Sequence, residues 1–242
     1  MTTRAAMSSN RKIAIIVGAL FLIAMATSLV GGTLIDSILG DAAQITDVSA
    51  NETQVIIGVL LELTNGIAVV GIGVMMFPIF KKYDEALALG YVALRIIEAI
   101  IIIAAVISPL ALVALSQETL TAGASEASTF QTVGSTLIAA RANLVSQLLG
   151  IFFSLAALLL YYLLYQTKLV PRFISVWGLI AVASVLTWNL LEIFGVSVSF
   201  GMILALPIIL NEIFLALWLI VKGFSSPALV PESAQASMST TG

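Results

Sequence analysis

The chain has 242 residues, of which 60% are hydrophobic and 10% are charged, and its formal net charge is −3. Because a soluble domain is about 45–50% apolar and about 25% charged, this composition excludes an ordinary soluble globule and predicts an integral membrane protein. The slight acidic excess argues against a nucleic-acid partner, and the absence of cysteine and histidine excludes disulfides, thiolate catalysis, Ser-His-Asp catalysis and metal or haem sites built from those residues.

Six stretches are long and apolar enough to cross a hydrocarbon core of ~30 Å, which takes ~20 helical residues. They lack the alternation of a transmembrane barrel, so helices remain as the way to satisfy the backbone. The sequence therefore predicts an all-α, polytopic membrane protein with six transmembrane helices in one bundle. The expected spans are residues 13–35, 55–80, 86–112, 144–165, 173–194 and 198–221.

The transmembrane domain is expected to cover residues 13–224. Charge and composition then indicate the nature of the segments on either side of it. Residues 1–12 form an expected N-terminal segment, and residues 225–242, rich in Ser, Thr, Ala and Pro, an expected disordered tail. Most basic residues flank the spans on one side, whereas the opposite connections are acidic. The positive-inside rule therefore places both termini in the cytoplasm. The aromatic cluster Tyr161, Tyr162 and Tyr165 before Lys168 is expected to anchor the fourth span at the membrane interface.

Ionisable side chains inside the spans are the main functional candidates, because each costs ~2.5–3.5 kcal/mol to insert. Many of the polar residues stand three or four positions apart, so each pair shares one helix face. Lipid does not solvate such faces, and we expect them to point inward and meet. The candidate ligand-binding residues are Glu62, Asn65, Arg95, Glu98, Asn211 and Glu212, with Gln147, Asn189 and Glu192 as a second group.

The depth of these residues predicts where a pocket would lie. A rise of ~1.5 Å per residue puts Arg95 and Glu212 near the membrane midplane and the other polar residues further from the cytoplasm. We therefore expect a pocket open to the extracytoplasmic side, with Arg95 and Glu212 at its floor. The four glutamates outnumber the basic residues Arg95 and Arg141 by two. This excess requires protonated carboxyl groups, a bound cation or a cationic ligand.

Three functions are compatible with this interpretation. In the first, the protein binds or moves a small ligand, a proton or a cation. In the second, it is a non-catalytic membrane regulator or partner subunit, and the polar cluster only holds the bundle together. The third is an intramembrane lipid-modifying enzyme, which the lack of His, Cys and a paired-Asp metal motif disfavours. We expect no catalytic residue, metal or cofactor. The lipid bilayer is the expected partner, and the identity of any protein partner stays open.

Six further stretches of the sequence are distinctive when taken together: ELTNGIAVV (62–70), PIFKK (78–82), GYVALRIIEA (90–99), LVPRFISVWGL (169–179), LPIILNE (206–212) and LWLIVKGF (217–224). Together they resemble a bacterial family of multi-helix membrane proteins catalogued as domain of unknown function 4386. The resemblance implies a six-helix protein of the bacterial inner membrane and supplies no reaction, substrate or catalytic residue. Glu62, Arg95, Glu98 and Glu212 fall inside these stretches, whereas Asn189 and Glu192 fall outside.

Overall fold

The computed structural model describes residues 8–40, 46–121, 124–196 and 201–225. All regular structure within these ranges is helical. Six helices are long and apolar enough to cross a membrane, as the sequence predicts, so the chain is a multi-pass membrane protein. The expected N-terminal segment is described only from residue 8, and residues 226–242 of the expected tail lie outside the described residues.

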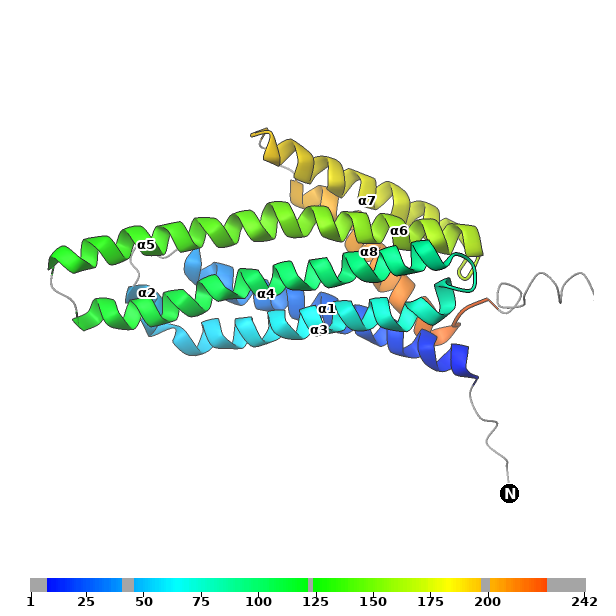
Figure 1. Ribbon diagram of the computed structural model, residues 1–242, viewed down its shortest axis with the longest axis horizontal. Coiled ribbons are helices and arrows are strands. Elements are labelled where there is room, and N and C mark those ends of the chain that lie inside the picture. The colour runs from blue at the N-terminus through cyan, green and yellow to red at the C-terminus, as the bar shows by residue number, and fades with distance from the viewer. Residues whose placement is uncertain (1–7, 41–45, 122–123, 197–200, 226–242) are drawn as a thin grey trace, which may run out of the picture.

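The spanning helices are α1, α3, α4, a continuous run of α5, η1 and α6, then α7 and α8 (Figure 1). A short helix, α2, lies between the first two spans. The bounds are α1 Ser9–Leu39, α2 Thr46–Ala50, α3 Glu52–Phe80, α4 Glu85–Thr121, α5 Ala124–Asn143, the π-helix η1 Leu144–Leu149, α6 Gly150–Thr167, α7 Arg172–Ile193 and α8 Gly201–Val221.

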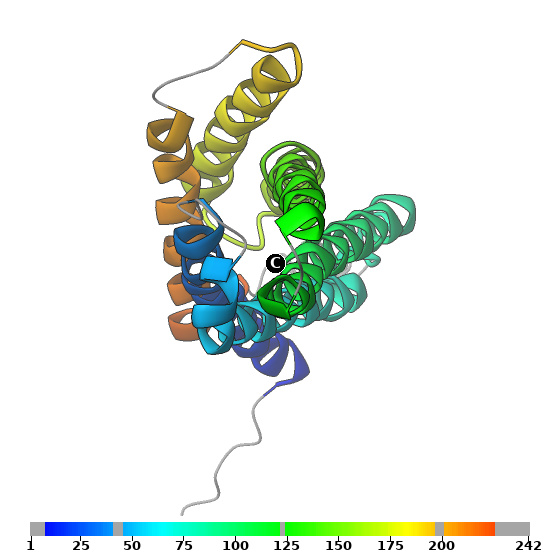
Figure 2. The ribbon, with the colours of Figure 1, turned by 90° about the vertical axis from the view of Figure 1, so that its left-hand side faces the viewer.

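The spans are arranged as a ring, in which α1 packs on α3, α3 on α4, α4 on α6, α6 on α7, α7 on α8, and α8 on α1 again. Figure 2 views this ring along the helices, from the end at which α4 and α5 meet. Glycines allow the closest crossings. A Cβ on Gly18 would lie 2.6 Å from the carbonyl oxygen of Ala216, and one on Gly31 would lie 3.0 Å from that of Gly58. Backbones therefore touch where α1 meets α8 and α3.

Both ends of the described chain, residues 8 and 225, lie at the same end of the ring, which we call the terminal end; the opposite end, where α4 and α5 meet, is the hairpin end (Figure 1). Arg11 joins the first and last spans at the terminal end. Its guanidinium donates to the carbonyl oxygens of Leu219 (3.1 Å), Ile220 (2.6 Å) and Val221 (3.1 Å). These carbonyls have no partner within α8, because the last turn of a helix leaves its acceptors free.

The hairpin of α4 and α5 is longer than the sequence indicates. We expected spans at residues 86–112 and 144–165, but α4 continues to Thr121, and α5 runs into η1 and α6 without a break. Figure 1 shows this hairpin extending past the ends of the neighbouring helices. The expected spans were too short because they counted only residues apolar enough for lipid, whereas a helix also persists where one of its faces packs on protein.

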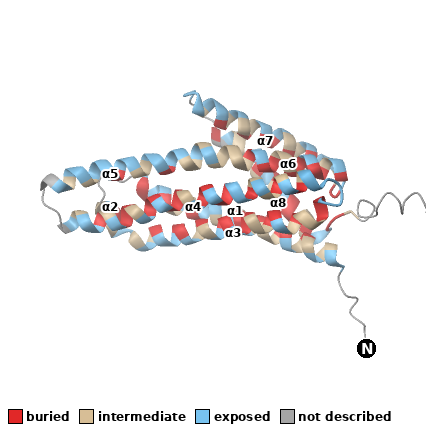
Figure 3. Cartoon of the chain, in the orientation of Figure 1, coloured by how far each residue is buried: buried red, intermediate tan, exposed pale blue. Residues whose placement is uncertain are grey.

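That packing surface is a second apolar core near the hairpin end. It includes Ile35 of α1, Val48 of α2, Val55 of α3 and Leu112 of α4, and Ile138 of α5 packs against it. The main core lies nearer the terminal end and draws on every span. Buried residues line the interior of the ring in Figure 3, and exposed ones cover its outer faces. Many of the exposed side chains are large and apolar, as a surface against lipid requires.

Candidate functional site

The inside of the ring contains a cavity of about 260 Å³. Five of the six spans line it, and α7 does not. Its walls are mainly apolar, with Phe21 from α1 and Phe153 from α6 among them. Four polar or charged candidates also line it, contributed by three helices: Asn65 from α3, Arg95 and Glu98 from α4, and Glu212 from α8.

Arg95 is the most strongly held of these side chains, and only 2% of its surface is exposed. Its Nη1 donates to Glu98 Oε2 at 2.9 Å, and its Nε donates to Tyr91 Oη at 3.1 Å. The rings of Tyr91 and Phe21 flank the guanidinium, with centroids 5.4 and 5.9 Å from its central carbon. The third nitrogen, Nη2, is buried and has no hydrogen-bond partner among the described residues.

A glycine on the facing helix makes room for this arginine. A Cβ on Gly73 of α3 would lie 3.2 Å from Arg95 Cβ and 3.4 Å from its Cγ. The sequence therefore allows the stem of Arg95 to lie directly against α3. The flanking rings and the two bonded nitrogens then fix the guanidinium in one orientation.

Glu212 and Asn65 differ from Arg95 in having unused hydrogen-bonding groups. Glu212 interacts electrostatically with Arg95 and Glu98, yet the described part of the chain offers it no hydrogen bond and no close ion pair. The side chain of Asn65 likewise forms no hydrogen bond with any described residue. The cavity thus exposes a carboxyl group and an amide that the protein itself does not satisfy.

Of the six first-choice candidates, the structure brings these four together and places two elsewhere. Asn211 is fully buried between helices, where its Nδ2 donates to the carbonyl oxygen of Ile174 at 3.0 Å and so joins α8 to α7. Glu62 is held by Arg141, as described below. Neither side chain lines the cavity, and each has a partner on another helix.

The second group of candidates also lies outside the cavity lining. Asn189 donates to the carbonyl oxygen of Val185 on its own helix at 2.8 Å. Glu192 accepts a hydrogen bond of 2.7 Å from Trp188 Nε1, one turn earlier. Gln147 belongs to η1 and is half-buried. The polar stripe of α7 is therefore satisfied within α7 itself.

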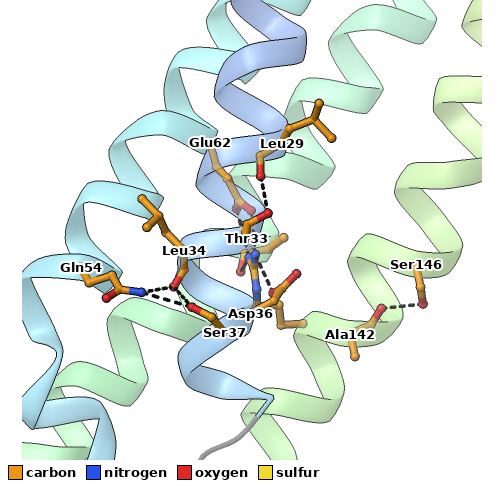
Figure 4. Close-up of polar contacts among 11 residues, drawn as sticks. Leu29, Thr33, Leu34, Asp36, Ser37, Gln54, Glu62, Ala142 and Ser146 are labelled. Carbon is orange, nitrogen blue, oxygen red and sulfur yellow. Dashed lines mark hydrogen bonds and ion pairs between the residues drawn. The ribbon is translucent and has the colours of Figure 1, made fainter. Parts of the chain in front are cut away.

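Arg141 forms a separate network at the hairpin-end side of the cavity. Its Nη1 and Nη2 donate to the two carboxylate oxygens of Glu62 at 3.0 and 2.6 Å. Nη1 also approaches the carbonyl oxygen of Ala105 at 3.3 Å, and Nη2 approaches Asp36 Oδ1 at 3.5 Å. Figure 4 shows Glu62 of α3 and Asp36 of α1 facing this point. The network joins α1, α3, α4 and α5, about one helical turn beyond the cavity residue Asn65.

The fourth span carries a π-helix beside the cavity. The wider turns of η1 cover Leu144–Leu149, and Val145, Leu149 and the following Gly150 line the cavity. Gly150 is in direct contact with the Asn189 side chain, so any Cβ there would overlap it. Short π-segments occur often at functional sites, and this one lies beside the charged side chains of the cavity.

Two tyrosines near the site were not predicted as part of it. Tyr91 stands four residues before Arg95, a spacing that puts both on one face and that sequence reasoning had available. Tyr161 was expected to be an interfacial anchor, which is wrong because it is fully buried. Its ring occupies the space left by Gly178 of α7, where any Cβ would overlap it. Its hydroxyl has no partner among the described residues, but it interacts electrostatically with Glu212.

The cavity combines a few polar groups with apolar walls. No group of three or more metal-ligating side chains occurs among the residues that the structure describes. The cavity is lined by a bonded arginine, an unpaired carboxyl group and an amide, surrounded by apolar walls. One nitrogen of the arginine, Nη2, is buried without a partner in the described part of the chain. These are the few polar groups on an apolar background that small-ligand sites use to orient a bound molecule.

Comparison with known proteins identifies the chain at the level of a family. A family model described as "Domain of unknown function (DUF4386)" matches residues 16–223, from within α1 to just beyond α8. No curated protein and no solved structure matches the chain. The resemblance found in the sequence is therefore confirmed, and the match extends over all six spans.

Proposed function

The chain belongs to the DUF4386 family, and from its own geometry we propose that it binds a small cationic ligand, or a proton in its place, inside the ring of helices. The ligand lies in the cavity between Glu212 of α8 and the Arg95–Glu98 pair of α4. Binding and release of this ligand is the step on which transport or a signalling response depends.

The proposal rests on the unpaired carboxylate of Glu212. Arg95 is already paired with Glu98 at 2.9 Å, so the two charges cancel and the carboxylate of Glu212 is left in excess. An unpaired carboxylate inside a membrane-spanning bundle is costly unless something neutralises it. A bound cation or a proton does so, and the cavity beside Glu212 provides the space.

Access to the cavity is proposed from the side nearer the hairpin end. Ser28 and Leu29 of α1 line the cavity and are also exposed, and we propose that its opening lies next to them. The basic residues gather at the terminal end, which the positive-inside rule assigns to the cytoplasm of a bacterial inner-membrane protein. The ligand would then enter from the extracytoplasmic side or from the adjoining lipid leaflet.

The main alternative is a regulator or partner subunit in which buried charges serve only stability. The Arg141–Glu62 pair favours it, because this pair joins helices without lining the cavity. The two functions differ in what they predict for Glu212, since a purely structural cluster requires no response to any ligand.

A matched pair of variants tests the proposal in purified protein held in lipid nanodiscs. The probe is 3-methylbutylammonium, a small monocation with an apolar body, and the readout is the thermal unfolding midpoint at rising probe concentration. A ligand that binds only the folded state stabilises it by ~2.7 kcal/mol at one hundred times its Kd. We expect wild type and the Glu192→Gln control to be stabilised, and Glu212→Gln to lose the response. An equal response in Glu212→Gln contradicts the proposal.

A further inference from the structure

Building on this proposed function, we infer that the ligand is a compact organic monocation that also carries an uncharged hydrogen-bond acceptor, such as a hydroxyl or carbonyl oxygen, a few bonds from its ammonium group. The ammonium group lies at Glu212, and the acceptor lies at the free nitrogen of Arg95. This assigns a ligand class to the cavity, from its unsatisfied groups and its shape.

The acceptor is inferred from Arg95. Its Nε and Nη1 are bonded to Tyr91 and Glu98, whereas Nη2 is buried without a partner in the described part of the chain. An unsatisfied buried donor costs ~1–3 kcal/mol, and more when it is charged. A simple cation such as an alkylammonium ion satisfies Glu212 and leaves this nitrogen unbonded. A ligand oxygen placed at Nη2 satisfies both groups together.

The lack of an ion pair between Arg95 and Glu212 in the described structure supports a bridging ligand. The two side chains carry opposite charges, line the same cavity and interact electrostatically, yet no ion pair joins them in the described structure. Arg95 is held back by Tyr91, Glu98 and the ring of Phe21. Because both residues line the cavity, a molecule with an acceptor at one end and a cation at the other would satisfy both.

The hydrogen-bond acceptor on the ligand is inferred to be neutral from the charges of the side chains that line the cavity. With Arg95 and Glu98 paired, the cavity carries one excess negative charge on Glu212. A monocation with a neutral acceptor brings the total to zero. A zwitterion such as an amino acid adds no net charge, so the excess stays buried, and its carboxylate would also approach Glu98. Such an uncompensated charge is disfavoured in a low-dielectric interior.

The size and walls of the cavity define the remaining part of the ligand. Its volume of about 260 Å³ is just below the ~300–1,000 Å³ typical of clefts for drug-sized molecules. The ligand is therefore compact. Phe21, Ile72 and Phe153 are among the apolar residues that line the cavity, so part of the ligand is a short hydrocarbon or a small ring.

Four probes that share one branched hydrocarbon body test this assignment. Leucinol carries an ammonium and a hydroxyl group, 3-methylbutylammonium carries only the ammonium, 4-methylpentan-1-ol carries only the hydroxyl, and leucine carries an ammonium and a carboxylate. Affinities are measured by thermal stabilisation and native mass spectrometry on wild type, Glu212→Gln and the Glu192→Gln control. We expect leucinol to bind best, by about tenfold over 3-methylbutylammonium, the ratio typical of one hydrogen bond to a charged group.

Arg95→Lys supplies the positioning test, because lysine keeps the charge beside Glu98 and loses the planar fork of donors. We expect this variant to bind leucinol and 3-methylbutylammonium equally. If Arg95→Lys does not fold, the wild-type ranking of the two probes decides the question by itself.

The outcomes separate this inference from the proposed function. Equal wild-type affinity for leucinol and 3-methylbutylammonium, with both lost in Glu212→Gln, overturns the acceptor and leaves the cation site standing. Tightest binding of leucine overturns the neutral acceptor in favour of a zwitterion. If 4-methylpentan-1-ol binds as well as leucinol, or if no probe depends on Glu212, the proposed cation site and this inference fail together.

Discussion

Arg95 and Arg141 are both buried arginines in spanning helices, and their partners differ in kind. Arg141 reaches the carboxylate of Glu62 with both terminal nitrogens and also contacts acceptors on two further helices. Arg95 bonds only to residues three and four positions away on its own helix. Each arginine has one buried nitrogen without a partner among the described residues, Nη2 in Arg95 and Nε in Arg141. The two therefore differ in that Arg141 joins helices, whereas Arg95 is bonded within α4 and lines the cavity.

The surroundings of the two arginines support the same distinction. Glu62, the partner of Arg141, is outside the cavity lining, whereas Arg95 shares the cavity with a second acid, Glu212. Burial of a charge is thus no sufficient sign of a functional site. Bonds to other helices distinguish Arg141, and a place in the cavity lining distinguishes Arg95.

Removing Arg141 is expected to have the largest effect on stability. Arg141→Ala leaves Glu62 buried without its partner, and breaking a buried pair in this way typically costs ~3–5 kcal/mol. The measurement is the free energy of unfolding in mixed micelles. The double variant Glu62→Leu with Arg141→Leu is the control, and it is expected to recover most of the loss because no lone charge remains. A loss below ~1 kcal/mol in Arg141→Ala would show that the pair does not join the helices.

The two glutamates are expected to respond oppositely to the same neutral substitution. Glu62→Gln removes charge-assisted hydrogen bonds, which are worth ~1.5–3 kcal/mol, and we expect a loss of stability in that range. Glu212→Gln removes an unpaired charge, so we expect unchanged or higher stability without ligand. Thermal unfolding of both variants checks this difference. Equal destabilisation by the two substitutions would mean that Glu212 also has a structural role.

A packing variant tests the contact that closes the ring without changing any charged residue. Gly18→Ala places a methyl group against the backbone of α8, 2.6 Å from the Ala216 carbonyl oxygen. Overpacking of this kind typically costs ~1–3 kcal/mol, and we expect a loss near the lower end because α1 can shift slightly. The ranking of the four probes should not change, since Gly18 does not line the cavity. A changed ranking would mean that contact between α1 and α8 shapes the cavity.

The smallest effect is expected at Asp36. Its side chain is 64% exposed and lies 3.5 Å from Arg141 Nη2. An exposed ion pair contributes ~0–1 kcal/mol, so Asp36→Asn should change the unfolding free energy by less than about 1 kcal/mol. A cost comparable to that of Glu62→Gln would show that Asp36 is an equal member of the Arg141 network.

The sequence was sufficient to predict the six spans and to select four side chains that the structure brings together. Asn65, Arg95, Glu98 and Glu212 line one cavity because polar groups in a span avoid lipid and point to the interior. The other candidates lie outside the cavity lining for a related reason. An interior polar side chain can also bond to a neighbouring turn or helix, as Asn211 does with Ile174 and Glu192 with Trp188. No spacing rule distinguishes these outcomes.

The Arg141 network could not be predicted from the sequence. Arg141 and Glu62 are 79 residues apart, and the pair forms only because α5 is helical and continues into the fourth span. That helix is stabilised by protein contacts near the hairpin end, which hydropathy does not register. The buried position of Tyr161 likewise depends on the space beside Gly178, a property of two helices together.

The bond between Arg11 and the last turn of α8 has a consequence for biogenesis. In the ring, α1 lies between α3 and α8, and α8 follows every other described span along the chain. During insertion α1 can therefore pack on α3 before it can pack on α8. A nascent chain that ends before α8 lacks both Glu212 and one wall of the cavity, so under the proposed function it would not yet bind the ligand.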